Sequence, residues 1–191
     1  MMKLKALRIF ALLALILSLL TLQVSAEVDT TLQNKCAATL VRLQLLRGDQ
    51  NGNLKLQDKV RRCEFITLVI RMLGYENDKD TSGVDFKFTD ISSKHWAYNN
   101  MKIALKYKLI TGYNDNTLKP DNYVTFTEAR AVLVRALGYE STMTGKWPDN
   151  VINKASDLGL NKDIDLPKDK EITRGETSVL IYNSLTVKFN R

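Results

Sequence analysis

Residues 124–139 have the sequence VTFTEARAVLVRALGY, and the prediction of the fold starts from these residues. Thr125 precedes Glu128 by three positions, directly before an apolar run, which is the pattern of a capping box at a helix N-terminus. In such a box the hydroxyl accepts from the amide three residues on, and the glutamate accepts from the amide of the capping residue. Gly138 stands where the end of a helix favours a left-handed residue. The stretch therefore predicts one helix with both ends marked.

The same pattern occurs 64 positions earlier in the chain. Residues 64–75 (EFITLVIRMLGY) repeat the Glu, Arg, Leu, Gly and Tyr of residues 128–139 (EARAVLVRALGY) in register, and the same offset aligns Gly48 with Gly112. A weaker third copy starts at Glu176. Because units of this size are too small to bury their own apolar faces, neighbouring copies must pack on one another.

Each repeat is predicted to be a helix, a loop and a second helix, so the fold class is all-α. The expected first helices span residues 35–47, 95–110 and about 150–158. The intervening loops, 48–59 and 112–123, are rich in the Gly, Asn and Asp that turns favour.

The first copy of the second helix lacks the capping threonine. Arg61 occupies that position, and we expect Asp58 to satisfy the helix start instead. In the third copy, Thr173 and Glu176 keep the capping box.

The N-terminus has the pattern of a secretory signal peptide. Lys3, Lys5 and Arg8 precede the uncharged stretch 9–22, and Val-Ser-Ala26 forms a small-residue cleavage site. We expect cleavage after Ala26, which leaves no segment of the length that a bilayer span needs. A retained membrane anchor is the alternative.

The charge of the chain argues against nucleic acid as a partner and is compatible with an anionic wall polymer. Cleavage removes three cations and no acidic residue, so the formal net charge falls from +7 to +4. The remaining Lys and Arg are scattered, which argues against nucleic acid, whereas an anionic wall polymer suits a mildly cationic exported protein. Cys36 and Cys63 permit one disulfide outside the cell, or two buried thiols.

No motif indicates an enzyme, a cofactor or a metal centre. The chain has a single His and no CxxC or HExxH spacing. Residues 49–54 resemble the start of a calcium loop, but its sixth position holds Leu54 and its twelfth Val60, where Gly and an acidic residue are needed. A catalytic triad is equally unsupported.

Residues 88–97 (FTDISSKHWA), 109–120 (LITGYNDNTLKP) and 124–139 together resemble a complete S-layer homology (SLH) repeat. The resemblance implies three repeats, at residues 34–78 (degenerate), 84–142 and 143–189, after a signal peptide at 1–26. It further implies a pseudo-threefold triplet around a central helical bundle, located in the cell wall or surface layer of a bacterium.

The implied ligand is a secondary cell-wall polysaccharide attached to peptidoglycan, typically one bearing pyruvate ketals. A guanidinium at a helix start offers charge and oriented donors to such a carboxylate. The family's Thr-Arg-x-Glu motif places that arginine at Arg62 and Arg174, whereas Phe126 occupies the position in repeat 2. Other surface-layer proteins are further candidate partners. The candidate glycan contacts are Arg62, Arg174, Asp90, Trp96, Tyr113 and Thr173.

Three of these candidates have a structural alternative. Trp96 lines a sugar groove or packs between helices, and Asp90 lines the groove or caps the first helix. Tyr113 stacks on sugar or covers the core. A module that has lost the glycan and binds another envelope protein is the alternative function.

Overall fold

The computed structural model describes residues 30–190, and within them the chain is helical, with no strand. The elements are α2 (Thr30–Arg42), α3 (Arg62–Met72), α4 (Tyr98–Lys106), α5 (Phe126–Ala136), the 3-10 helix η1 (Glu140–Thr142), α6 (Asp149–Asp157) and α7 (Arg174–Ser184). The all-α prediction is confirmed. The predicted signal peptide lies outside the described residues. None of the helices in 30–190 combines the length and apolarity that a bilayer crossing requires.

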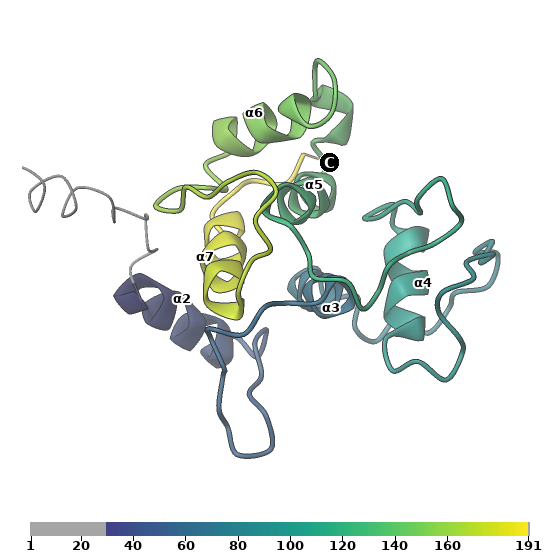
Figure 1. Cartoon of the computed structure of the whole chain (residues 1–191), viewed down its shortest axis with the longest axis horizontal. Coiled ribbons are helices and arrows are strands. Elements are labelled where there is room, and N and C mark those ends of the chain that lie inside the picture. Colours follow the sequence, from purple (N-terminus) through teal and green to yellow (C-terminus); the bar gives the residue numbers. More distant parts are fainter. Residues whose placement is uncertain (1–29, 191) are drawn as a thin grey trace, which may run out of the picture.

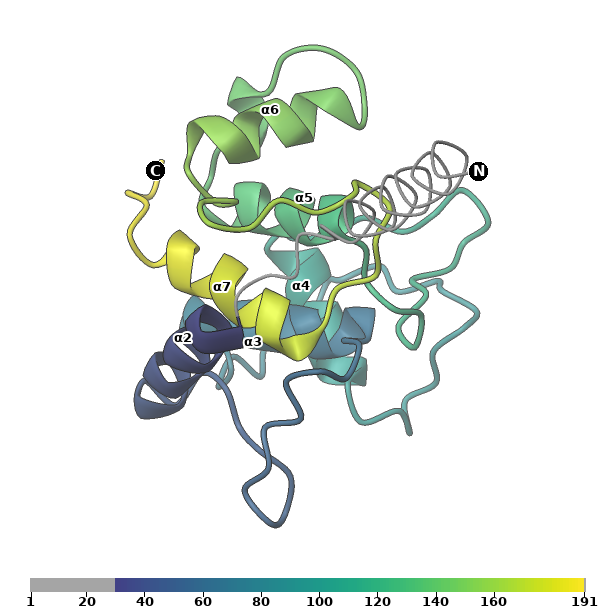
Figure 2. The ribbon, with the colours of Figure 1, turned by 60° about the vertical axis from the view of Figure 1, so that its left-hand side comes forward.

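The three second helices lie at the centre of the molecule, with the first helices outside them (Figure 1). α3 contacts α5, and α5 contacts α7. Each outer helix packs on the second helix of a different predicted repeat, because α2 lies on α7, α4 on α3 and α6 on α5. Figure 2 shows α2 beside α7 and α6 beside α5 from a second direction. The packed helix pair is therefore formed between repeats.

A closed ring of three backbone hydrogen bonds joins the entries of the central helices. The amide of Val60 donates to the carbonyl of Ile172 (3.0 Å), Ile172 donates to Val124 (3.1 Å), and Val124 donates to Val60 (3.0 Å). All three side chains are completely buried. Three isolated β-bridges flank the ring: Lys59 with Thr173, Arg61 with Tyr123, and Thr125 with Glu171. The ring is consistent with a threefold triplet, which as a whole stays a prediction.

The first amides of each central helix are satisfied by the loop of another repeat. In α3, Arg62 donates to the carbonyl of Asn122 (2.8 Å) and Cys63 to that of Pro120 (2.9 Å). In α5 the acceptors are the carbonyls of Lys170 and Lys168, and in α7 those of Asp58 and Leu56. Four N-terminal amides of any helix lack intrahelical partners, so these carbonyls replace water at buried helix ends.

Asp58 was expected to cap α3, and this prediction is wrong. Its main-chain carbonyl caps α7, where it accepts from Arg174 at 2.9 Å. At α3 the carboxylate of Glu64 accepts from the amide of Arg61 (2.7 Å), but a guanidinium has no acceptor for the reciprocal bond. The loop carbonyls from residues 120–122 fill this gap.

The other predicted helix signals are confirmed. Thr125 and Thr173 accept from the amides of Glu128 and Glu176, and both capping boxes are complete. Gly74 (φ 75°) and Gly138 (φ 85°) end α3 and α5 in the left-handed conformation.

The expected first helices are displaced or too long. The helix expected at 35–47 spans 30–42, and the helix expected at 95–110 spans 98–106. Gln44 (φ 61°) and Lys108 (φ 55°) adopt the left-handed conformation and stop the two helices early, although neither residue is a typical terminator. The helix expected at about 150–158 spans 149–157.

Cys36 and Cys63 are separate thiols, both buried in the core. The structure therefore has the second of the two arrangements that the sequence left open, in which the cysteines pack as small apolar residues.

Loss of a capping hydroxyl should weaken the central helices. Replacing Thr125 or Thr173 by Ala is expected to lower the free energy of unfolding by about 1 kcal/mol, because the amide of the third residue loses its acceptor. Urea denaturation measures this loss. Thr89→Ala is the control, since the Thr89 hydroxyl makes no hydrogen bond within residues 30–190. Equal losses for all three variants would contradict the assignment.

The interlocked packing predicts one cooperative unfolding transition. Ile172→Ala should lower stability by roughly 2–5 kcal/mol, and the loss should be seen equally by tryptophans in different repeats. Trp147→Phe leaves Trp96 as the only fluorescent tryptophan, and Trp96→Phe leaves Trp147. If Ile172→Ala shifts the transition reported by Trp147 but not that reported by Trp96, the repeats are independent units.

Candidate functional site

The start of α3 and the outer face of α5 enclose a groove of about 190 Å³, which we call the Arg62 groove. Its charged and aromatic lining residues come from α3, the loop after α4, α5 and the segment before α6. These residues are Arg62, Tyr113, Glu128, Arg135 and Trp147. Chain segments more than 80 positions apart therefore meet at one site.

Arg62 lies at the floor of this groove and is only 7% exposed. Its Nε donates to the carbonyl of Leu118 at 3.1 Å, and its Nη1 lies 3.9 Å from Oε1 of Glu128. The guanidinium carbon is 5.3 Å from the centroid of the Tyr113 ring. The cation is thus held by a carbonyl, a carboxylate and an aromatic face at once.

Glu128 caps the start of α5 and also interacts with Tyr113 and Arg62 in the groove. One carboxylate oxygen accepts from the amide of Thr125 (3.0 Å), and the other accepts from the hydroxyl of Tyr113 (2.6 Å). Burial opposes ionisation, but these hydrogen bonds and the charge of Arg62 together hold the pKa of Glu128 below its usual value. Burial also raises the pKa of Tyr113 to about 12, so its hydroxyl stays a donor.

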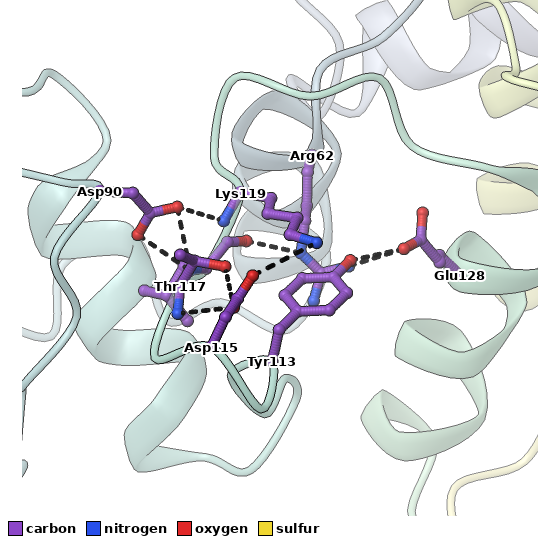
Figure 3. A network of polar contacts seen from close by, with 8 residues as sticks. Arg62, Asp90, Tyr113, Asp115, Thr117, Lys119 and Glu128 are labelled. Carbon is purple, nitrogen blue, oxygen red and sulfur yellow. Dashed lines mark hydrogen bonds and ion pairs between the residues drawn. The ribbon is translucent and has the colours of Figure 1, made fainter.

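A network of polar contacts shapes the loop that presents Tyr113 (Figure 3). The carboxylate of Asp90 accepts from the amides of Leu118 (3.0 Å) and Lys119 (2.7 Å). Asp115 accepts from the hydroxyl of Thr117 (2.6 Å), and Nζ of Lys119 lies 4.1 Å from the centroid of the Tyr113 ring. These contacts fix the carbonyl of Leu118, which in turn orients Arg62.

Asp90 does not cap α4, and its contact with glycan stays a prediction. It does not line the Arg62 groove, and α4 has no side-chain cap at its start. The carboxylate reaches the loop amides because residues 88–90 run beside that loop, where the amide of Thr89 donates to the carbonyl of Asn116.

A second groove, which we call the Arg174 groove, lies at the start of α7 and is lined by residues at positions equivalent to those of the Arg62 groove. It consists of two adjoining hollows of about 330 and 160 Å³ that share Arg47, Glu64 and Arg174. Arg71 and Trp96 line the smaller one. Both grooves contain equivalent residues. Arg174 corresponds to Arg62 and Glu64 to Glu128, while Arg71 corresponds to Arg135 and Trp96 to Trp147.

Arg174 is bound to main-chain carbonyls. Its Nε donates to Leu54 (2.6 Å) and its Nη2 to Arg47 (2.9 Å), and both carbonyls belong to the loop after α2. Thr173 caps α7 through the amide of Glu176 and does not line either groove.

An exposed tryptophan borders each groove. Trp96 is 59% exposed and Trp147 is 57% exposed. Of the two roles proposed for Trp96, packing between helices is therefore wrong. Tyr113 belongs to the Arg62 groove, where its hydroxyl bond to Glu128 directs the ring toward Arg62.

The third interface is closed by the chain itself. Phe126, which replaces the motif arginine, is 1% exposed and lies 4.0 Å from the guanidinium carbon of the buried Arg130. The ammonium of Lys170 pairs with Glu176. The motif glutamate of this interface is therefore already neutralised by a lysine.

Cys63, His95 and Asp121 come together, with one ligand atom of each within 4.8 Å of the others. Nδ1 of His95 accepts from the amide of Ala97 (3.1 Å), so in the neutral ring Nε2 holds the proton and faces Asp121 at 3.4 Å. Asp121 also pairs with Arg61 (3.0 Å), and burial raises the pKa of Cys63 to about 12. His95 therefore links Asp121 to the segment before α4, and neither a protonated Nε2 nor a protonated thiol is in the form that binds a metal ion.

Sequence reasoning missed Trp147, Arg71 and Arg135. The segment Trp147-Pro148 precedes α6 as Trp96-Ala97 precedes α4, so comparison of these positions would have found the second tryptophan. Both arginines lie in the last turn of a central helix, where a cation suits the helix dipole and so gives no sign of a groove. Arg71 pairs with Glu76 (2.9 Å) and Arg135 with Glu140 (2.8 Å), and each also lines a groove.

Comparison with known proteins gives one family and several relatives. The sequence model of the S-layer homology domain matches residues 87–129. The chain is 35% identical over 153 residues to the middle cell wall protein of Brevibacillus brevis, covering 80% of this chain and 14% of that protein. It is 32% identical over 181 residues to the surface layer protein of Brevibacillus choshinensis, covering 92% of this chain and 16% of that protein. It is 30% identical over 151 residues to the cell surface protein of Thermoanaerobacter kivui, covering 78% of this chain and 19% of that protein. The chain spans less than a fifth of each of these relatives.

The lowered pKa of Glu128 predicts a specific pH dependence. Its stabilising contribution should be complete above about pH 4.5, the ordinary value, and should be lost as pH falls through the lower folded-state pKa. Glu128→Gln keeps a capping box but removes the charge. The difference in unfolding free energy between wild type and this variant should shrink in acid. Asp157→Asn is the control, since this exposed carboxylate forms no ion pair within residues 30–190. A pH-independent difference for Glu128→Gln would contradict the assignment.

Proposed function

The chain belongs to the S-layer homology domain family, and from this premise we propose that it is a non-catalytic module that binds a secondary cell-wall polysaccharide at the bacterial surface. The observation that supports the proposal is the pair of grooves, each of which combines a fixed arginine, a glutamate and an exposed tryptophan. The wall and surface names of the relatives are in keeping with this location. The predicted signal peptide would deliver the module there.

The chemistry of the grooves suits an acidic glycan. An exposed indole offers a flat apolar face to a sugar ring. A guanidinium whose orientation is fixed by main-chain carbonyls offers its remaining donors to a carboxylate, such as that of a pyruvate ketal. Neither groove is an enclosed cavity, which is in keeping with an extended polymer as ligand.

The proposal includes the absence of catalysis. In the Arg62 groove, Glu128 accepts from Thr125 and Tyr113 and lies beside Arg62, which favours its ionised form. A general acid needs a pKa raised toward neutrality. The imidazole of His95 is held by Ala97 and Asp121 away from both grooves.

The closed third interface favours a second candidate, a structural module that binds another envelope protein. Phe126 and the pair formed by Lys170 and Glu176 leave one of three interfaces without a cation for ligand. Two open grooves remain, and for this reason we place glycan binding first.

Binding to isolated cell walls tests the proposal. The mature chain should co-sediment with purified sacculi and should lose this binding when the secondary polymer is removed. The double variant Arg62→Ala, Arg174→Ala should bind roughly tenfold or more weakly, because each charge-assisted hydrogen bond contributes about 1.5–3 kcal/mol. Binding should also weaken as salt rises, since partly exposed ion pairs are screened.

Arg42→Ala is the matched control, since this arginine lies on α2 and lines neither groove. Far-UV circular dichroism and thermal unfolding identify a variant that has simply lost its fold. If sacculi without the polymer bind the chain as well as intact ones, the envelope-protein alternative takes the place of the glycan.

A further inference from the structure

The two groove arginines differ in their partners, although they occupy equivalent motif positions. Arg62 is 7% exposed, with Nη1 3.9 Å from a carboxylate oxygen of Glu128. Within residues 30–190, no carboxylate lies within ion-pair distance of Arg174. Within the same residues, both hydrogen bonds that its side chain donates go to neutral carbonyls, those of Leu54 and Arg47.

The equivalent glutamates show the same difference. Glu128 accepts from the hydroxyl of Tyr113 and faces Arg62, so its charge neutralises its own groove. Glu64 accepts from the amide of Arg61 and pairs with no cation within the described chain. The position equivalent to Tyr113 in the Arg174 groove is Asp49, whose carboxylate accepts from the amides of Asn51 and Asn53.

The other cations of the Arg174 groove already have partners. Lys59 pairs with Glu171 (2.6 Å), Lys55 with Asp49 (3.3 Å) and Arg71 with Glu76 (2.9 Å). Arg174 is half-buried, and its charge is therefore partly removed from water without a compensating anion. An incoming carboxylate would supply that anion, whereas in the Arg62 groove it would have to compete with Glu128.

We infer that the Arg174 groove is the site that recognises the carboxylate of the wall glycan, and that Glu128 prevents the Arg62 groove from doing so. This inference rests on the proposed function and deepens it, because it assigns the charged part of the ligand to one groove. Removal of the Glu128 charge should convert the Arg62 groove into a second carboxylate site.

The test compares two forms of one ligand. Purified wall polysaccharide is used as isolated and after chemical reduction of its carboxyl groups to alcohols, which removes the charge and keeps the sugar chain. Calorimetry gives the dissociation constant for each form. The ratio of the two constants measures carboxylate recognition and is insensitive to a uniform loss of affinity.

Wild type should bind the native polymer about tenfold to a hundredfold more tightly than the reduced polymer. Arg174→Ala should bring this ratio close to one, whereas Arg62→Ala should leave it within about twofold of wild type. Glu128→Gln should raise the ratio severalfold. Because Gln supports a capping box, this gain does not depend on a variant that risks unfolding.

Asp85→Asn is the matched control for Glu128→Gln. It makes the same change in net charge at an exposed position that lines neither groove, and its ratio should equal that of wild type.

The inference is overturned if carboxyl reduction leaves wild-type affinity unchanged, if Arg62→Ala removes the preference for the native polymer, or if Glu128→Gln leaves the ratio unaltered. In each of these cases the chain still binds the polymer, so the proposed function stands. If wild type binds neither form of the polymer, the proposed function fails together with the inference.

Discussion

The ring of backbone hydrogen bonds among Val60, Val124 and Ile172 holds the three central helices in place. Each residue precedes a central helix by two positions or fewer, so the ring sets where the three helices start relative to one another. A buried amide without an acceptor costs about as much as a lost hydrogen bond. Because the bonds are cyclic, displacement of any one segment would leave polar groups unpaired on the other two.

The loops that lead into the central helices hold the helix starts in a similar way. Each loop passes through the ring region and offers two carbonyls to the first amides of a helix in another repeat. This explains how α3 forms without a capping hydroxyl, since the carbonyls of Pro120 and Asn122 take over part of that task. It also explains why one degenerate repeat is tolerated: its weak helix start is completed by its neighbour.

The grooves are a consequence of this interlocking. Because a loop from one predicted repeat meets a helix start from another, Arg62 and Arg174 each line a groove together with the glutamate and the loop of a different repeat. The motif glutamate then has two tasks, to cap its helix and to set the charge of the groove. Glu128, Glu64 and Glu176 perform the first task alike, but their different neighbours give three chemically distinct interfaces.

The amino-acid sequence was enough to predict the all-α class, the three central helices and the glycine ends of two of them, α3 and α5. These signals act within four or five residues, because the Thr125 and Thr173 hydroxyls and the left-handed Gly74 and Gly138 are local. The sequence also pointed to Arg62 and Arg174 through one short motif. Four other roles emerge only from the folded chain. The carbonyl of Asp58 caps α7, the carboxylate of Asp90 holds a loop, Trp147 borders a groove, and Arg62 is ion-paired whereas Arg174 is not. The physical reason is that these roles depend on which distant segment lies opposite, and that choice is made by the closed hydrogen-bond ring and the packing of each outer helix on another repeat.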